Sequence, residues 1–264
     1  MELLGYIASA LIGISLGLIG GGGSILTVPV LVYLFGVQPL LATSYSLFIV
    51  GSTSLIGSVN NLRSGLINYK ATLSFGAASV ITVFSTRKFL VPILSTQTIT
   101  IGNFTITESL LTMVLFGVLM LVASISMIRD KGAIGPEKEC SDCIKIFKLL
   151  GYGVGIGMVT GLLGAGGGFL LIPALMFFVK LPIKNAIGTS LAIIAMNSLV
   201  GFVGDIGHFN IDWIFLLSIT TIAVAGIFIG ELLNKRIAGK TLKKGFGWFV
   251  LVMGIYIIIR EISL

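Results

Sequence analysis

The chain has 264 residues, of which 56% are hydrophobic and only 10% are charged, and its mean hydropathy is +1.10. Soluble globular domains carry about 25% charged residues, so this composition excludes the soluble classes and indicates an integral membrane protein. The net charge of +7 therefore describes the loops, and it bears on membrane orientation rather than on nucleic-acid binding.

Apolar segments follow one another along the chain, separated by short polar connections. They cover approximately 3–36, 43–60, 71–94 and 108–128 in the first half, and 148–179, 186–206, 213–234 and 246–262 in the second. The first segment has no basic start and no small-residue cleavage motif, so we do not interpret it as a signal peptide. A membrane-spanning helix needs about 20 residues. The segments 3–36 and 148–179 are too long for one span, and glycines interrupt both.

The two halves of the sequence are related by a shift of 144 residues. The shift places Gly20–Ser24 on Gly164–Gly168 and Pro29 on Pro173, and it also pairs Ser46 with Ser190, Ser54 with Ser198, Gly57 with Gly201 and Tyr69 with Trp213. A single offset that holds over about sixty residues indicates a duplication. We predict a first transmembrane repeat at 1–128, a cytoplasmic linker at 129–147 and a second repeat at 148–264.

Lys and Arg residues in the connections predict the orientation of the chain. The connections near 129–148 and 235–244 hold five each and should be cytoplasmic, whereas 95–107 and 204–212 hold none and should be outside. Between the two cytoplasmic connections lie one interrupted segment and two ordinary spans, so the interrupted segment must cross the membrane twice or not at all. We therefore predict a hairpin, built of two half-helices or of two short tilted spans, and two repeats of inverted orientation with both termini outside.

A hairpin inside the membrane explains the run of glycines, because glycine tolerates positive φ and close backbone approach. Non-helical backbone inside a membrane must be buried in protein or line a wet cavity. A helix that restarts after the turn directs free N–H groups and partial positive charge toward that cavity, which favours anions. We expect such an anion cradle at Ser24–Leu26 and Gly168–Leu170. Tight helix packing alone is the alternative explanation of the glycines.

The sequence resembles the TauE/SafE family of sulfite and organosulfur-anion exporters. The resemblance rests on the two glycine-rich turns followed by proline, Gly20–Pro29 and Gly164–Pro173, on the stretch GTSLAIIAMNSLVGFVG at Gly188–Gly204 and on FNIDW at Phe209–Trp213. It implies secondary transport of small sulfur-containing anions, with sulfite, thiosulfate, sulfonates and sulfoacetate in range. The first half departs from the expected pattern, since it reads ATSYSLFIVGSTSL in place of a simple Thr-Ser-Leu.

Polar side chains on the segment after each hairpin are the best candidates to line a binding site, together with the glycine turns. The predicted substrate-binding residues are Gly22, Gly23, Ser24, Ile25, Ser46, Ser54, Gly166, Gly167, Gly168, Phe169, Thr189, Ser190, Asn197 and Ser198. Ser44, Tyr45, Thr53, Asn60 and Asn61 are further polar candidates. Hydroxyl and amide donors would bind an anion without the cost of a buried cation. The alternative is that these side chains only hold helices together.

Charged residues receive structural interpretations. We expect Asp205 and His208 to form an exposed pair in an outer loop rather than a proton-coupling site, although histidine titrates near pH 6.5. We expect Glu231 to pair with Lys235 at a helix end. The orientation puts Arg87 and Lys88 near the outer interface, against the positive-inside bias. We expect Arg63 and Lys70 to set the membrane topology rather than to attract anions.

The only cysteines form the motif Cys140-Ser-Asp-Cys143 in the central loop. A single C-x-x-C could serve a redox couple or half of a zinc site, but a reduced, solvated loop is the simpler interpretation. We expect no metal and no cofactor.

The leading functional hypothesis is a secondary anion transporter, because the sequence contains no G-x-x-x-x-G-K-[ST] motif for ATP hydrolysis. A passive anion channel of the same architecture is the alternative. A membrane enzyme or a scaffold fits less well, since the apolar segments hold few acids and a single histidine, yet keep polar donors at depth. The expected partners are a small anion, protons as coupling ion, the lipid bilayer and a second copy of the chain, without nucleic acid. The expected location is the prokaryotic plasma or inner membrane, crossed several times.

Overall fold

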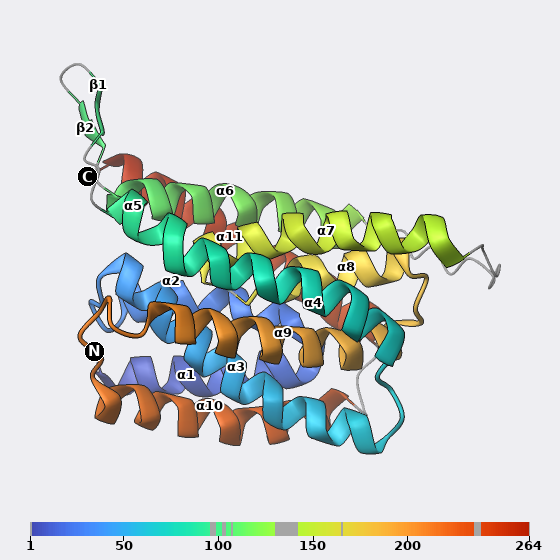
Figure 1. The fold of residues 1–264 in the computed structure, drawn as a ribbon. Coiled ribbons are helices and arrows are strands. Elements are labelled where there is room, and N and C mark those ends of the chain that lie inside the picture. Colours follow the sequence, from blue (N-terminus) through green and yellow to red (C-terminus); the bar gives the residue numbers. More distant parts are fainter. Residues whose placement is uncertain are drawn as a thin grey trace.

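The computed structural model describes residues 2–95, 99–101, 104–106, 108–129, 142–164, 166–234 and 239–263. Helices run lengthwise between two ends of the molecule, and both termini lie at the same end (Figure 1). The first half contains α1 (Glu2–Ile19), the 3-10 helix η1 (Gly21–Leu26), α2 (Thr27–Tyr33), α3 (Pro39–Arg63), α4 (Tyr69–Ser85), the π-helical turn η2 (Thr86–Leu90), α5 (Val91–Ser95) and α6 (Glu108–Arg129). The second half contains α7 (Asp142–Leu163), α8 (Gly168–Phe178), α9 (Ile183–Asp205), α10 (Trp213–Asn234) and α11 (Gly239–Ser263).

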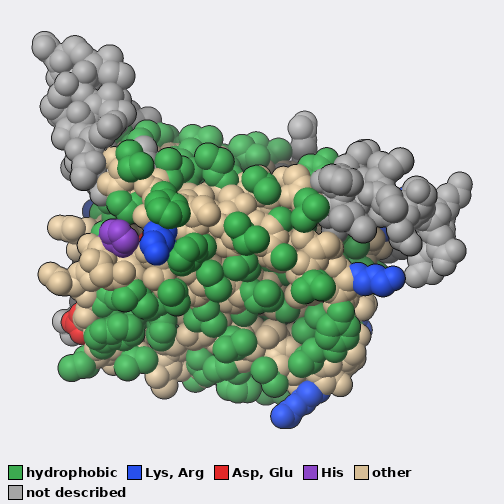
Figure 2. Space-filling model, in the orientation of Figure 1, with side chains coloured by type: hydrophobic (Ala, Val, Ile, Leu, Met, Phe, Trp, Pro, Cys, Tyr) green, Lys and Arg blue, Asp and Glu red, His purple; other side chains and the backbone are tan. Residues whose placement is uncertain are grey.

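Within the described ranges, three helices are long and apolar enough to cross a membrane. They are Pro39–Arg63, Lys184–Asp205 and Trp213–Leu233, which belong to α3, α9 and α10. Hydrophobic side chains are spread over the whole face seen in Figure 2, and the Lys and Arg side chains on it lie toward its two ends. An apolar surface of this extent fits contact with lipid. The expectation of a helical membrane protein is confirmed at this level.

The interrupted segments fold back on themselves, as the parity of the loops predicts. The rings of Tyr6, near the start of α1, and Phe35, just after α2, lie 5.7 Å apart. Gly23 in η1 packs against Ser15 and Leu16 near the end of α1, so the chain reverses direction after α1. The two legs of this hairpin differ in length, with 18 residues in α1 and 13 in the return leg, of which six belong to η1 and seven to α2.

The second interrupted segment has the same unequal form, with 22 residues in α7 and 11 in α8. Gly167, just before α8, packs against Thr160 and Ile156 of α7. The long leg, α7, is long enough to cross a membrane, because 22 residues at about 1.5 Å each span its apolar thickness. The short leg begins where glycines break the helix.

Helix contacts between the two halves recur at the 144-residue shift. α3 packs on α9 and α6 packs on α11, and each of these pairs joins two helices that the shift relates. The contact of α1 with α10 is matched by the contact of α7 with α4, in which each helix is the counterpart of a helix in the first pair. At the residue level, Gly57 of α3 contacts Ile227 of α10, and Gly201 of α9 contacts Val83 of α4. A shift by 144 converts one of these contacts into the other. Small residues at both positions let the helices approach closely.

Three local features differ from the sequence-based expectations. The segment 71–94 is not one regular helix, because η2 widens it between Thr86 and Leu90, where the Val91 N–H bonds to the Thr86 carbonyl. The expected all-helical fold includes one exception, since β1 (Ile99–Ile101) and β2 (Phe104–Ile106) pair antiparallel within the 95–107 connection. Some helices also begin earlier than expected, as α7 does at Asp142 instead of near residue 148 and α11 does at Gly239 instead of near residue 246.

Candidate functional site

The two glycine turns meet in the interior of the protein. Gly21, the first residue of η1, and Gly168, the first residue of α8, touch backbone to backbone, and a Cβ on either would overlap the other's backbone. Gly20 has φ of 73°, and Gly166 and Gly167 each have φ of 65°. Such angles strain residues with side chains. Glycine is therefore required both for the turns and for their contact.

Helix α9 lines this meeting point on one side with Ile194 and Ser198, and Ser190 precedes them on the same face of the helix. These residues are four apart and share one face of the helix, and all three are buried. A Cβ on Gly166 would lie 2.9 Å from Ser198 Oγ and 3.1 Å from Ile194 Cγ2. Ile194 Cδ1 also lies against Gly21. We call this row the α9 stripe.

Helix α3 supplies a second row of the same kind, the α3 stripe, formed by Ser46, Val50 and Ser54. These positions correspond to the α9 stripe at the 144-residue shift, and they too are buried. A Cβ on Gly166 would lie 2.8 Å from Val50 Cγ1. The glycine turns are thus enclosed by equivalent faces of both repeats.

Several buried hydroxyls around the turns have no hydrogen-bond partner in the part of the chain that the structure describes. They include Oγ of Ser46 and Ser54 in α3 and of Ser198 in α9, and Oγ1 of Thr27 in α2 and of Thr160 in α7. An unsatisfied buried polar group costs about 1–3 kcal/mol, and most such groups in proteins are paired. The concentration of free hydroxyls beside a glycine contact makes this region the best candidate for binding a polar solute.

Other predicted residues use their polar atoms within the protein. Ser24 Oγ donates to the Gly21 carbonyl at 2.7 Å, and Ser190 Oγ donates to the Ile187 carbonyl at 2.8 Å. Thr189 Oγ1 accepts the Asn68 N–H at 3.0 Å, which helps fix the start of α4. These contacts give the residues structural roles, and their contact with a substrate stays a prediction.

Asn197 has one polar atom that is hydrogen-bonded within the protein and one that is free. Its Nδ2 donates to Ser79 Oγ at 2.6 Å, while its Oδ1 has no partner within the described residues. Gly22, Gly23 and Ile25 lie within η1, whereas the side chain of Phe169 lies outside what the structure describes. Of the further polar candidates, Tyr45 accepts the Asp212 N–H, Thr53 bonds to the Ile49 carbonyl, and Asn61 bonds to the Gly57 carbonyl.

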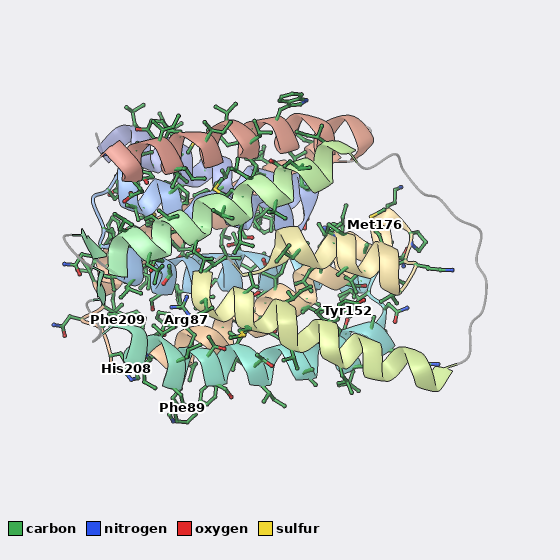
Figure 3. All side chains as sticks on the ribbon, turned by 90° about the horizontal axis from the view of Figure 1, so that it is seen from above. Arg87, Phe89, Tyr152, Met176, His208 and Phe209 are labelled. Atoms are coloured by element: carbon green, nitrogen blue, oxygen red, sulfur yellow. The ribbon has the colours of Figure 1, made fainter. Side chains whose placement is uncertain are left out.

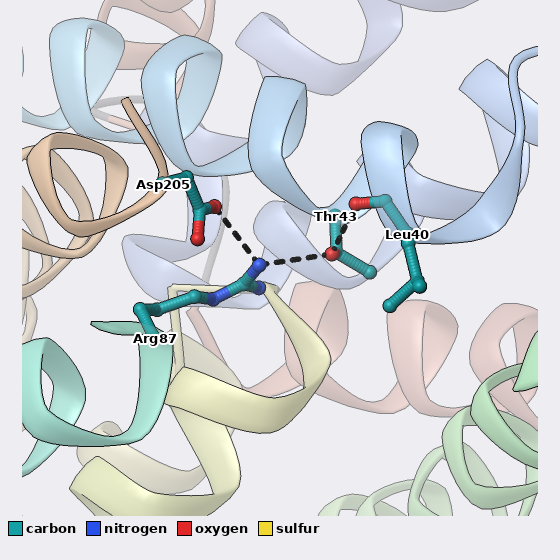
Figure 4. Close-up of polar contacts among 4 residues, drawn as sticks. All are labelled: Leu40, Thr43, Arg87 and Asp205. Atoms are coloured by element: carbon teal, nitrogen blue, oxygen red, sulfur yellow. Dashed lines mark hydrogen bonds and ion pairs between the residues drawn. The ribbon is translucent and has the colours of Figure 1, made fainter. Parts of the chain in front are cut away.

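A buried ion pair lies beyond the stripes, toward the end that carries the termini. Arg87 is fully buried and Asp205 is 1% exposed, and Arg87 Nη1 donates to Asp205 Oδ2 at 3.0 Å and to Thr43 Oγ1 at 3.1 Å (Figure 4). Arg87 and His208 lie toward this same end in Figure 3, opposite Tyr152 and Met176.

This ion pair corrects two expectations. Asp205 is not part of an exposed loop, because α9 extends to it, although His208 is exposed as expected. Arg87 does not lie at the interface, whereas Lys88 is exposed. The signal for the pair was present in the sequence, because an ionisable residue within an apolar segment indicates a buried partner. The partner itself, 118 residues away, could not be read from the sequence.

Glu231 has a different described partner from the one expected. Its Oε2 accepts a hydrogen bond of 2.7 Å from Asn60 Nδ2, while Lys235 lies outside the described residues. Cys140 also lies outside them, and Cys143 belongs to the first turn of α7.

The family model described as "Sulfite exporter TauE/SafE" matches residues 6–257. The chain belongs to the TauE/SafE family. A "Probable membrane transporter protein" of Xylella fastidiosa is 28% identical over 96% of this chain and 94% of its own length. The "Probable membrane transporter protein YunE" of Bacillus subtilis is 26% identical over 85% of both chains, and a "Probable membrane transporter protein" of Methanocaldococcus jannaschii is 26% identical over 96% and 94%. No solved structure matches the chain significantly.

Membership of the TauE/SafE family and the apolar helices together identify a multi-pass membrane transporter. The glycine turns and both stripes fall inside the matched residues, so they belong to the shared transporter region of the family.

Proposed function

We propose that the protein is a secondary transporter of small sulfur-containing anions and that the anion binds where the two glycine turns meet. The observation that carries the proposal is the buried hydroxyl of Ser198, which lies against Gly166 and has no partner among the described residues, together with the free hydroxyls of Ser46 and Ser54 on the α3 stripe, whose Val50 also contacts Gly166. The family description supports the sulfur-containing class of substrate.

The chemistry of the region suits an oxyanion. Sulfite and sulfonate oxygens accept hydrogen bonds, and serine hydroxyls donate them. The N-cap positions of η1 and α8 are Gly20 and Gly167, which have no side chains to accept from the first N–H groups of those helices. Helix N-termini of this kind favour anions through their free donors and partial positive charge.

We further propose that the two repeats are inverted in the membrane and exchange access to this site. The contacts that recur at the 144-residue shift support the proposal. So do the starting points of α1 and α7, which lie at opposite ends of the molecule in Figure 1. Rocking of one repeat against the other around a central site is a common route to alternating access.

The test is uptake of labelled sulfite, thiosulfate and a sulfonate by proteoliposomes, with and without an imposed pH gradient. We expect at least one of these anions to accumulate above its equilibrium level when a gradient is present, while protein-free liposomes accumulate none. Failure of all three to move under any gradient would contradict the sulfur-anion assignment. Rapid flux that never exceeds equilibrium, with or without the gradient, would instead indicate a passive channel.

A further inference from the structure

The guanidinium of Arg87 has one edge in use and the other free. Nη1 makes both described contacts, to Asp205 Oδ2 and Thr43 Oγ1. Nε and Nη2 are buried and have no hydrogen-bond partner anywhere in the described ranges. Figure 4 shows Asp205 and Thr43 on the Nη1 side of the group.

The free edge is the one that recognises oxyanions. The N–H bonds on Nε and Nη2 are parallel and form the fork that holds two oxygens of a carboxylate, phosphate or sulfonate group. Asp205 takes a single contact at Nη1 and leaves this fork untouched. A buried arginine that served structure alone should have its donors satisfied, since each unpaired donor is costly at zero exposure.

The fork lies at the entrance to the second glycine turn. A Cβ on Gly164, the residue that follows α7, would lie 2.5 Å from Arg87 Nη2. Gly164 is two residues from Gly166, which contacts Ser198 of the α9 stripe. Asp205 is seven residues after Ser198, or about 10 Å along α9. The ion pair therefore lies at the end of the α9 stripe nearest the chain termini.

The second repeat has no equivalent fork. The position 144 residues after Arg87 is Glu231, and its carboxylate accepts a hydrogen bond from Asn60. Equivalent places at the two ends of the molecule thus carry opposite charges. An anion would therefore meet the Arg87 guanidinium at one of these two equivalent places and the Glu231 carboxylate at the other.

We propose that Nε and Nη2 of Arg87 bind two oxygens of the transported oxyanion at this end of its path, and that Asp205 is the counter-ion that holds Arg87 between binding events. This inference rests on the proposed transport function and adds a specific contact to it. The ligand class is a small anion with at least two terminal oxygens on one atom, such as sulfite or a sulfonate.

The direct test is the variant Arg87→Lys, which keeps the charge and removes the planar fork. Sulfite binding to purified protein in detergent is measured by calorimetry and by the rise in melting temperature. We expect the dissociation constant to increase about 10- to 100-fold, because a charge-assisted bidentate contact is lost. Arg63→Lys is the matched control, since Arg63 is exposed at the end of α3, and it should bind as the wild type does.

A second variant, Asp205→Asn, separates binding from structure and keeps the proposal testable if Arg87→Lys does not fold. Loss of the counter-ion should lower the melting temperature of the anion-free protein, because it leaves a buried charge uncompensated. Sulfite should then raise the melting temperature more than it does in the wild type. If sulfite stabilises Asp205→Asn no more than the wild type, or if Arg87→Lys binds sulfite normally, the Arg87 site is wrong.

Parallel titrations with phosphate and acetate distinguish this inference from the proposed function. If the wild type binds phosphate or acetate but no sulfur oxyanion, and Arg87→Lys loses that binding, the Arg87 site stands and the sulfur-anion function falls. If proteoliposomes take up sulfite and Arg87→Lys binds it as tightly as the wild type, the function stands and the Arg87 site falls. Absence of binding of every anion to the wild type would also overturn the Arg87 site.

Discussion

At the scale of single residues, buried serines in equivalent settings differ in what their hydroxyls contact. Ser190 and Ser198 lie two turns apart on the same face of α9, and both are fully buried. Ser190 donates to a carbonyl in its own helix, whereas Ser198 has no partner among the described residues and faces Gly166. The first hydroxyl is satisfied locally and the second is available, so they should differ in their effect on transport.

We predict that Ser198→Ala weakens sulfite transport without destabilising the protein. Removal of an unpaired buried hydroxyl should leave the melting temperature unchanged or higher, while loss of one neutral hydrogen bond to the anion should raise KM about three- to tenfold. Uptake kinetics in proteoliposomes and thermal melting measure the two effects.

Ser190→Ala is the control on the same face of the helix. Because Ser190 Oγ already bonds to the Ile187 carbonyl, this variant should keep the wild-type KM. Wild-type KM values for both variants would place the α9 stripe outside the binding site.

At the scale of helices, the contact between η1 and α8 is the feature that brings the two repeats together at depth. Gly21 and Gly168 allow their backbones to touch, as no other residue could. The same contact brings the starts of two helices close to both stripes. Even a small substitution at Gly21 or Gly168 should therefore have a large effect on the site.

We predict that Gly168→Ala abolishes transport and lowers the melting temperature, because the added methyl group would overlap the backbone of Gly21. Overpacking of this kind costs about 1–3 kcal/mol or more where backbone has to move. Proteoliposome uptake and thermal melting are the measurements.

Gly155→Ala in α7 is the matched control, since an added Cβ there meets no atom within 4 Å. This substitution should preserve transport and stabilise the helix by about 0.5–1 kcal/mol. Normal transport by Gly168→Ala would show that the glycine contact is not needed for the site.

At the scale of the whole molecule, the orientation in the membrane decides which solution each end contacts. The connections predicted to be outside, 95–107 and 204–212, lie at the end of the molecule that carries the termini and Arg87 (Figures 1 and 3). Inverted repeats would put the connection before α9 on the cytoplasmic side and the connection after it on the outside.

We predict that His208→Cys reacts with a membrane-impermeant maleimide in intact cells and that Lys184→Cys reacts only after permeabilisation. Both native side chains are exposed, so access to the reagent should depend on the side of the membrane. Cys140→Ser and Cys143→Ser provide the background without native thiols. Labelling of both positions from the outside would refute the predicted crossing of the membrane by α9.

The sequence by itself determined the class of the protein, the approximate helices and the places where they break. These follow from local properties, namely the apolar composition, the length of each segment and the conformational freedom of glycine at Gly20 and Gly166. The duplication was also visible, because a repeated residue pattern needs no knowledge of contacts.

Only the tertiary structure decided which buried polar groups are satisfied and which are free. The difference between Ser190 and Ser198, and the pairing of Arg87 with Asp205, depend on neighbours far away in the chain. The widened turn at Thr86–Leu90 is likewise seen only in the folded chain. A sequence records which donors and charges exist, but their partners are fixed only when the helices pack, and the unpaired ones are what a transported anion could bind.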